Sequence, residues 1–293
     1  MHAPQPELPA STHRNVLVGR DGWLFLQNDT NDVMAQLTGR YPLPADFMDQ
    51  WRCLFELRRQ RLESLTGQYF FGVIPNKACV YSQHLPDDVV LQSRRPVHDI
   101  MDAGQGAIRH HYFLQDLIDY SHLHQTYCKG DTHWNHRGAL CAFNSLMRKM
   151  RLPELTESEL AFETRSIAGD LTGKIGQTTQ TEHATIIEPK FNTVHDNGVS
   201  NVGRLVIMEN ENKNLPSLVL FRDSFGSAQM QMFASRFSRV VAVWQPNIDY
   251  EIVRRESPDF VISQQVERFL TSCPNDSSGP SNAEYVAMKR AKS

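Results

Sequence analysis

Ser224 has the sequence surroundings of a serine nucleophile. It follows an apolar run at 218–221 that predicts a short buried strand, and a helix-like pattern begins at about residue 226. A tight turn between such a strand and helix projects its side chain from the carboxyl end of a parallel sheet, where ligands bind in this type of fold. Backbone N–H groups at the start of the helix can stabilise an oxyanion. A serine hydroxyl is a poor nucleophile on its own, so the chain must also supply a base.

A second stretch supplies that base, because Asp131 and His133 lie two residues apart just before a well-patterned helix. In extended backbone, residues i and i+2 point to the same side. Asp131 can therefore hold one ring nitrogen of His133 while the other takes the Ser224 proton. The two stretches together predict a triad of Ser224, His133 and Asp131. Each residue also has an ordinary structural interpretation, since Ser and His before a helix often serve as caps or surface residues.

The order of motifs along the chain resembles the SGNH hydrolase-like domain of the alginate O-acetyltransferase family, the AlgX/AlgJ type. In ordinary SGNH esterases the Ser block comes first, whereas here the Asp/His block precedes Ser224, as in this permuted family. The likeness extends from residue 16 to about residue 270. Its motifs are residues 19–25 (GRDGWLF), 73–77 (VIPNK) with Tyr81, 131–135 (DTHWN), 169–171 (GDL) and 222–225 (RDSF).

The resemblance implies a three-layer α/β sandwich with a mostly parallel sheet. It implies an O-acetyltransferase that carries the acetyl group on Ser224 and delivers it to a hydroxyl of a polysaccharide or other glycan, of the alginate or exopolysaccharide-modification type. The partners implied are a glycan acceptor, an acetyl donor and a membrane-bound protein of acetyl transfer, with no cofactor. It also implies the periplasm. However, the chain opens without a signal-peptide pattern, and five cysteines without CxxC spacing suit a reducing compartment, so the location stays open.

Three further residues are candidates for binding the oxyanion or the substrate, and each has two interpretations. Asn76, after an apolar strand at 69–74, either donates its amide to the oxyanion, as a loop Asn does in SGNH enzymes, or only makes the turn. Trp134 either stacks on a sugar ring or is a core aromatic. Arg222, where many SGNH enzymes have Gly, either faces the site and favours anionic glycans or is a paired structural arginine.

Other functions remain open on the same residues. A carbohydrate esterase (deacetylase) would use the same triad with water as the acceptor. A non-catalytic glycan-binding protein would retain the fold without the chemistry. A metal-dependent hydrolase is suggested by His122, His124, Asp131, His133 and His136, but no second carboxylate cluster accompanies them, and we expect no metal site.

Composition excludes several classes of protein. The chain has 293 residues, of which 40% are hydrophobic and 22% charged, as expected for a globular protein. The net charge is −3, and Lys and Arg are spread along the chain, so no nucleic-acid partner is expected. No apolar run approaches the ~20 residues of a transmembrane helix, and we expect no transmembrane segment.

Periodicity predicts the elements that position these residues. We expect a hairpin at 16–26, a long helix at 45–65, strands at 69–74 and 112–118, and a helix at 136–150. Strands at 218–221, 240–244 and 260–263 alternate with helices at 226–236 and 249–255, a pattern typical of a parallel sheet. We expect one domain at 16–270, between a mobile arm at 1–15 and a disordered tail at 271–293.

Overall fold

The computed structural model describes residues 15–188 and 190–291, and its centre is a seven-stranded sheet in the order β4-β3-β11-β9-β10-β8-β7. The five strands from β4 to β10 run parallel, and β8 and β7 complete the sheet in antiparallel pairings. The strands are β3 (Gln68–Ile74), β4 (Arg109–Tyr112), β7 (Phe191–Asp196), β8 (Leu205–Asn210), β9 (Ser217–Arg222), β10 (Arg239–Trp244) and β11 (Phe260–Val266).

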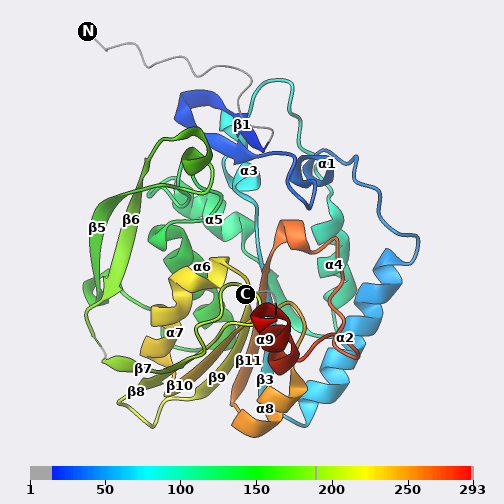
Figure 1. Ribbon diagram of the computed structural model, residues 1–293, viewed down its shortest axis with the longest axis vertical. Helices are drawn as coiled ribbons and strands as arrows, with labels where there is room; N and C mark the ends of the chain where they lie inside the picture. Colours follow the sequence, from blue (N-terminus) through cyan, green and yellow to red (C-terminus); the bar gives the residue numbers. More distant parts are fainter. Residues whose placement is uncertain (1–14, 189, 292–293) are drawn as a thin grey trace.

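Helices cover both faces of this sheet, which makes the expected three-layer α/β fold (Figure 1). One face packs against α5, α6 and α7, and the other against α2, α4 and α8. The helices are α1 (Val33–Leu37), α2 (Phe47–Glu63), α3 (Lys77–Val80), α4 (Pro96–Gly104), α5 (Leu114–Ser121), α6 (His136–Met150), α7 (Met230–Arg236), α8 (Tyr250–Glu256) and α9 (Asn282–Arg290).

Strand β9 shows why the apolar runs form the centre of the sheet. Leu218 and Leu220 belong to the core with α6 and α7, whereas Val219 and Phe221 belong to the core with α8. Successive side chains of a strand point to opposite faces, so a strand covered on both faces must be apolar throughout. The prediction of a mostly parallel α/β sheet is confirmed.

Two small antiparallel sheets flank the centre. The expected hairpin at 16–26 is present as β1 (Val16–Val18) and β2 (Leu24–Leu26). The second hairpin, of β5 (Leu160–Ile167) and β6 (Thr179–Ile186), lies beside α6 in a region where the sequence predicted little (Figure 1).

The expectation of a strand at 112–118 is wrong. Strand β4 ends at Tyr112, and α5 begins two residues later. Leu114, Leu117 and Ile118 have the i, i+3, i+4 spacing of a helix face, and all three pack in the core with α6. The apolar residues of this stretch therefore follow a helical period and not that of a strand.

The expectation of a disordered tail is also wrong for residues 271–291. Asp276 accepts two hydrogen bonds from the guanidinium of Arg58, at 2.7 and 3.0 Å, with both side chains fully buried. Helix α9 follows, and its start is stabilised by a reciprocal pair of hydrogen bonds between Ser281 and Glu284. We propose that this segment belongs to the domain that was expected to end at 270. The expected mobile arm lies outside the described residues, apart from Asn15.

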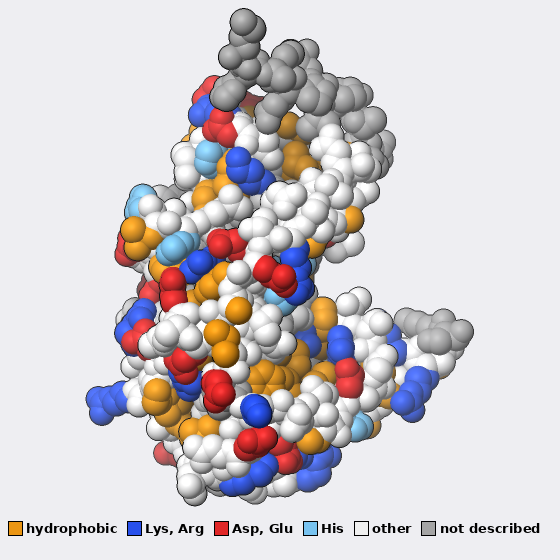
Figure 2. All heavy atoms as spheres, turned by 90° about the vertical axis from the view of Figure 1, so that its left-hand side faces the viewer, with side chains coloured by type: hydrophobic (Ala, Val, Ile, Leu, Met, Phe, Trp, Pro, Cys, Tyr) orange, Lys and Arg blue, Asp and Glu red, His pale blue; other side chains and the backbone are white. Residues whose placement is uncertain are grey.

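The described part of the chain has no helix that is both long and apolar enough to cross a membrane. The face that carries β5 and β6 shows basic and acidic side chains interspersed, with no large area of one sign (Figure 2). This face therefore lacks the basic stripe that is typical of nucleic-acid binding.

The buried Arg58–Asp276 pair predicts a measurable role for the C-terminal segment. Asp276→Ala leaves a guanidinium buried without its carboxylate, which should lower the free energy of unfolding by about 3–5 kcal/mol. Urea denaturation followed by tryptophan fluorescence measures this loss. Glu56→Ala is the control, because it removes an exposed partner of Arg59 on the same helix and should have little effect. Equal effects of the two substitutions would contradict this role.

Candidate active site

Ser224 lies immediately beyond β9, in a turn that a buried carboxylate holds in shape. Asp223 accepts a hydrogen bond from Phe225 N at 2.9 Å and one from Val266 N, at the end of β11, at 2.7 Å. Burial raises the pKa of Asp223, while these two N–H groups, Arg268 and His133 oppose the shift. The carboxyl ends of β9 and β11 are thus tied together under Ser224.

The Asp/His loop reaches the same edge of the sheet from the start of α6. Asn135 caps this helix by accepting a hydrogen bond from Gly138 N at 3.0 Å. Trp134 then ties the loop to the serine turn, because its indole N–H donates to Phe225 O at 3.0 Å. Two segments about ninety residues apart in the sequence are therefore joined beside Ser224.

The structure brings the three predicted catalytic residues into one hydrogen-bonded row. His133 Nδ1 lies 2.7 Å from Asp131 Oδ1, and His133 Nε2 lies 2.8 Å from Ser224 Oγ. With the proton on Nδ1, the ring donates to Asp131 and accepts from the serine hydroxyl. This is the geometry in which an imidazole can take the serine proton.

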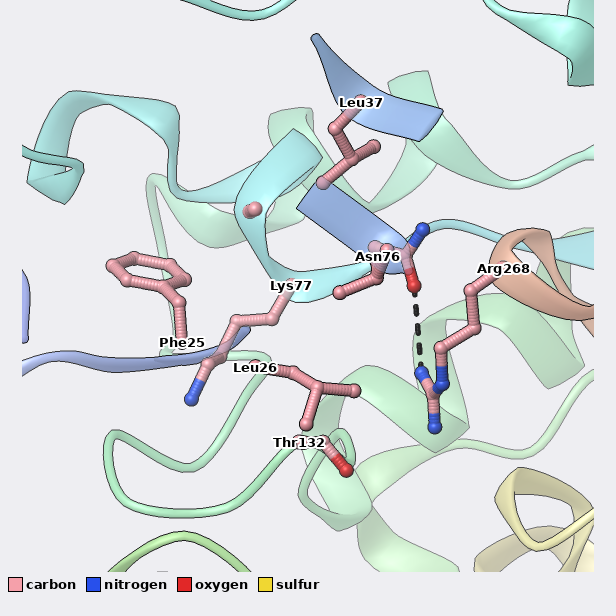
Figure 3. A pocket seen from close by; sticks show the side chains of 9 residues that line it. Phe25, Leu26, Leu37, Asn76, Lys77, Thr132 and Arg268 are labelled. Atoms are coloured by element: carbon pink, nitrogen blue, oxygen red, sulfur yellow. Dashed lines mark hydrogen bonds between the residues drawn. The ribbon is translucent and has the colours of Figure 1, made fainter. Parts of the chain in front are cut away.

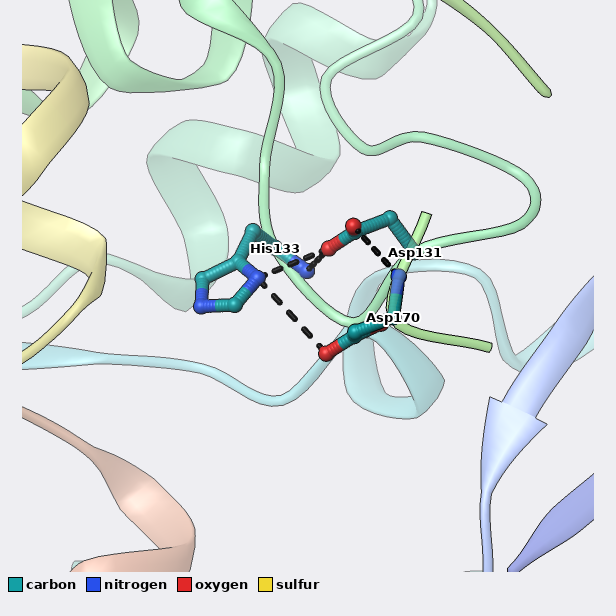
Figure 4. A group of neighbouring side chains, drawn as sticks. All are labelled: Asp131, His133 and Asp170. Carbon is teal, nitrogen blue, oxygen red and sulfur yellow. Dashed lines mark hydrogen bonds and ion pairs between the residues drawn. The ribbon is translucent and has the colours of Figure 1, made fainter. Parts of the chain in front are cut away.

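Hydrogen bonds stabilise Asp131 in the ionised state that this row requires. It accepts from His133 N at 2.8 Å and from Asp170 N at 2.9 Å (Figure 4). Burial alone would raise the pKa of Asp131, but the hydrogen bonds and charge of His133 and the Asp170 N–H outweigh it and hold the pKa at about 2.

Asp170 is a second carboxylate at the site, to which the sequence analysis gave no role. Its Oδ2 lies 3.7 Å from His133 Nδ1, and its Oδ1 accepts from Thr132 N at 2.7 Å. The motif at 169–171, which contains Asp170, was the sequence feature that could have indicated this role. Asp131, His133 and Asp170 also form a group whose ligand atoms lie within 4.8 Å of one another, close enough for a metal ion. However, Asp131 Oδ1 and His133 Nδ1 are already hydrogen-bonded to each other. This favours the hydrogen-bonded row with Ser224 over a metal site.

Lys77 holds the Asp/His loop in place through hydrogen bonds to the backbone of the loop. Its ammonium donates to the backbone oxygens of Cys128, Lys129 and Asp131, at 3.0, 2.9 and 2.6 Å, and its side chain is 4% exposed. Burial lowers the pKa of Lys77 to about 7, and Asp170 and Asp131 oppose this shift. The residue lies in the motif at 73–77, but its partners are more than fifty residues away, so only the fold reveals its role.

Asn76 lies just beyond the carboxyl end of β3, and its side-chain amide is only half used within the described part of the chain. Its side chain is 4% exposed, Oδ1 accepts from Arg268 Nη1 at 3.4 Å, and Nδ2 has no hydrogen-bond partner among the described residues (Figure 3). Because Arg268 engages the oxygen, the amide is oriented with its N–H groups unused. Arg268, which the sequence analysis missed, also lies over the Phe225 ring, 5.3 Å from its centroid. Burial lowers the pKa of Arg268, and Asp223 opposes the shift.

Arg222 and Trp134 have structural positions. Arg222 is 1% exposed, lies over the Trp244 ring at 4.5 Å, and donates to Asp223 O and Ser227 Oγ, each at 3.0 Å. Burial lowers its pKa to about 10, and Asp223 opposes the shift. Trp134 is 3% exposed and uses its N–H on Phe225. The burial of Arg222 does not fit the expectation that it faces an anionic glycan. Trp134 is among the residues that line the cavity beside Ser224, so its contact with a sugar stays a prediction.

An open cavity of about 470 Å³ lies next to the row, and Ser224 and His133 both line it. His136, from the start of α6, and His183, from β6, line it as well. Three histidines of the metal hypothesis, His122, His124 and His136, do not belong to the group of potential ligands found among the described residues.

Comparison with known protein families finds a match over most of the chain. The family described as "SGNH hydrolase-like domain, acetyltransferase AlgX" matches residues 16–225. A comparison with curated proteins finds no match.

Solved structures share the fold. Bacillus cereus PatB1, solved with a sulfonyl adduct, has a TM-score of 0.67 at 15% identity, covering 88% of this chain and 95% of that one. The O-acetyltransferase domain of Pseudomonas putida AlgJ has a TM-score of 0.59 at 17% identity, covering 94% and 99%. Pseudomonas aeruginosa AlgX has a TM-score of 0.51 at 15% identity, covering 88% of this chain and 63% of that one.

The low pKa of Asp131 predicts a loss of stability in acid. An unfolded Asp has a pKa of about 3.9, so below about pH 5 Asp131 binds more protons in the unfolded chain than in the folded one. A stabilisation of roughly 2 kcal/mol is thus present above pH ~4 and lost as the pH falls to about 2. Asp131→Asn should flatten the pH dependence of the free energy of unfolding by this amount. Asp88→Asn, which changes an exposed carboxylate, should keep the wild-type slope. A slope that Asp131→Asn leaves unchanged would contradict the assignment.

Proposed function

The chain belongs to the family of AlgX-type SGNH hydrolase-like acetyltransferases, and from this premise we propose that it moves an acetyl group to a glycan hydroxyl through an acetylated Ser224. The observation that carries the proposal is the 2.8 Å contact of His133 Nε2 with Ser224 Oγ, with Asp131 on the other ring nitrogen. A base in contact with a hydroxyl and oriented by a carboxylate is the arrangement that activates serine.

The reaction has two steps. His133 takes the Ser224 proton while Oγ attacks the acetyl carbonyl carbon, and the tetrahedral intermediate expels the donor's oxygen, which receives that proton. The acetyl group is then an ester on Ser224. In the second step His133 takes the proton of the acceptor hydroxyl, whose oxygen attacks the ester, and Ser224 Oγ leaves with the proton. Asp131 stabilises the imidazolium that forms in each step.

The oxyanion of each intermediate needs donors that are already in place. We assign this role to the Ser224 N–H and to Nδ2 of Asn76, which is buried without a partner among the described residues. Arg268 supports it as a positioning residue, since its contact with Oδ1 keeps the amide from turning over. An unpaired buried amide costs stability, and an oxyanion would supply its missing partner.

A carbohydrate esterase is the alternative, because water can replace the glycan in the second step. A non-catalytic glycan-binding protein would leave the contacts of His133 without a purpose. A metal-dependent hydrolase would need Asp131 and His133 to exchange their mutual hydrogen bond for an ion. The family likeness favours an acetyl donor delivered by a membrane-bound partner in the periplasm.

We expect Ser224 to be acetylated when the protein is briefly exposed to an activated acetyl ester such as p-nitrophenyl acetate. Intact mass spectrometry should find one added acetyl group, mapped to Ser224, on the wild type and none on Ser224→Ala or His133→Ala. Ser200→Ala, which changes an exposed loop serine, is the matched control and should react like the wild type.

Adding candidate glycans then distinguishes the functions. Acetylated glycan indicates a transferase, and acetate alone indicates an esterase. Turnover that persists in Ser224→Ala and disappears with a chelator would replace the proposal with the metal-dependent one. If the wild type shows neither an acetyl label nor turnover, the proposal is refuted.

We expect Asn76→Ala to slow acetylation of Ser224 by about 100-fold to 1,000-fold, because one oxyanion donor is lost. Asn76→Asp, which keeps the shape and replaces the amide N–H groups by an oxygen, should be at least as slow. Stopped-flow release of p-nitrophenolate measures the rate, and Asn192→Ala on exposed β7 is the control. A rate within about threefold of the wild type would exclude Asn76 from the oxyanion site.

A further inference from the structure

Among the residues that the structure describes, none with a permanently charged side chain lines the cavity beside Ser224. The residues that line its volume of about 470 Å³ are His133, Trp134, His136, His183, Ser224, Phe225, Ser227, Ala228 and Gln231. Its size is in the range of small-molecule sites. Hydroxyl, amide and imidazole groups therefore make up the polar surface that the described residues contribute, and these residues include no Lys, Arg, Asp or Glu.

Two of these residues form a pair whose rings lie against each other. The centroids of the His136 and His183 rings are 4.1 Å apart, with one ring at the start of α6 and the other on β6. His183 Nδ1 is buried and has no hydrogen-bond partner within the described ranges. A proton there would be a buried, unsatisfied donor, so the ring is best accommodated neutral, with its N–H on Nε2.

The surroundings also favour the neutral form of both rings. Burial and the neighbouring His183 lower the pKa of His136 to about 4, although the Ala184 backbone opposes this. Burial and Arg165 lower the pKa of His183, and Glu163 opposes them. Arg165 itself pairs with Glu163. Near neutral pH, the pair therefore presents hydrogen-bonding groups without charge.

Several cations near the residues of the cavity have other partners. Arg268, which lies over the Phe225 ring, donates to Asn76 Oδ1 at 3.4 Å, and Arg165 pairs with Glu163. Arg222 lies beneath the serine turn on Trp244, and Arg137 pairs with Glu157 at 2.7 Å. A carboxylate that entered the cavity would leave water without gaining a cation, which is unfavourable. A sugar hydroxyl, by contrast, can exchange its hydrogen bonds with water for bonds to imidazole, amide and hydroxyl groups.

We propose that the cavity binds an uncharged sugar unit as the acetyl acceptor, and that His136 and His183 determine this specificity by hydrogen bonding to its hydroxyls. The role as acceptor rests on the proposed function, whereas the preference for an uncharged sugar rests on the walls of the cavity. The inference departs from the expectation of an anionic glycan that Arg222 raised.

Isothermal titration calorimetry at pH 7.5 without acetyl donor tests the preference directly. The ligands are a β-1,4-linked mannose tetrasaccharide and the matching mannuronic acid tetrasaccharide, which differ in the carboxylate at C6. We expect the wild type to bind the neutral sugar at least about tenfold more tightly. His183→Ala should weaken that binding about fivefold to tenfold, as the loss of a neutral hydrogen bond predicts, and so should His136→Ala.

A charge-introducing variant gives the sharper comparison. His183→Arg places a permanent cation at the cavity and should raise the affinity for mannuronate about tenfold while weakening that for mannose. His195→Arg is the matched control, since it makes the same change on exposed β7, away from the cavity lining, and should behave like the wild type. Thermal melting establishes that each variant is folded. If His136→Ala is not folded, His136→Gln is measured in its place.

Three results would overturn the inference: mannuronate bound as tightly as mannose by the wild type, equal behaviour of the His183 and His195 variants, or no binding of either sugar up to about 10 mM. These results are separate from a failure of the proposed function. That function fails if Ser224 takes no acetyl group, whichever sugar binds. The inference fails if the preference is missing, even when Ser224 is acetylated.

Discussion

The buried ammonium of Lys77 must find acceptors inside the protein, and it finds them in the backbone of the loop that carries Asp131. A charge or a polar amine without such bonds would be costly at that depth. The loop is therefore held against the end of β3. This also fixes the position of His133, which lies two residues beyond Asp131. Asn76 precedes Lys77 directly, so one turn after β3 both supports the base and supplies the amide assigned to the oxyanion.

The parallel sheet explains why the order of motifs along the chain matters little. The carboxyl ends of β3, β9 and β11 meet at one edge, and they bring Asn76, Ser224 and Arg268 there from three distant segments. The Asp/His loop reaches the same edge from a helix start. A permuted chain can therefore assemble the same site, provided that each motif stays at the end of its strand.

The sequence was informative where a pattern is local. Continuous apolar runs predicted the central strands, and the spacing of Asp131 and His133 predicted their mutual contact. It was uninformative where a partner is remote: the contacts of Lys77, Arg268 and Asp170 depend on tertiary packing, and residues 271–291 were misread because one buried Asp276 among polar residues anchors the segment. Arg222 and Trp134 had two interpretations because sequence does not tell which way a side chain turns at a strand end.

One wall of the cavity belongs to a hairpin outside the main sheet. Within the described ranges, β5 and β6 pair with each other and with no other strand. Strand β6 contributes His183, whereas Ser224 and His133 are held by the central sheet and α6. Selection can therefore alter the hairpin without disturbing the groups that form and break bonds. Related proteins can therefore differ in the hairpin residues that would contact a sugar, while the residues that carry out the reaction stay the same.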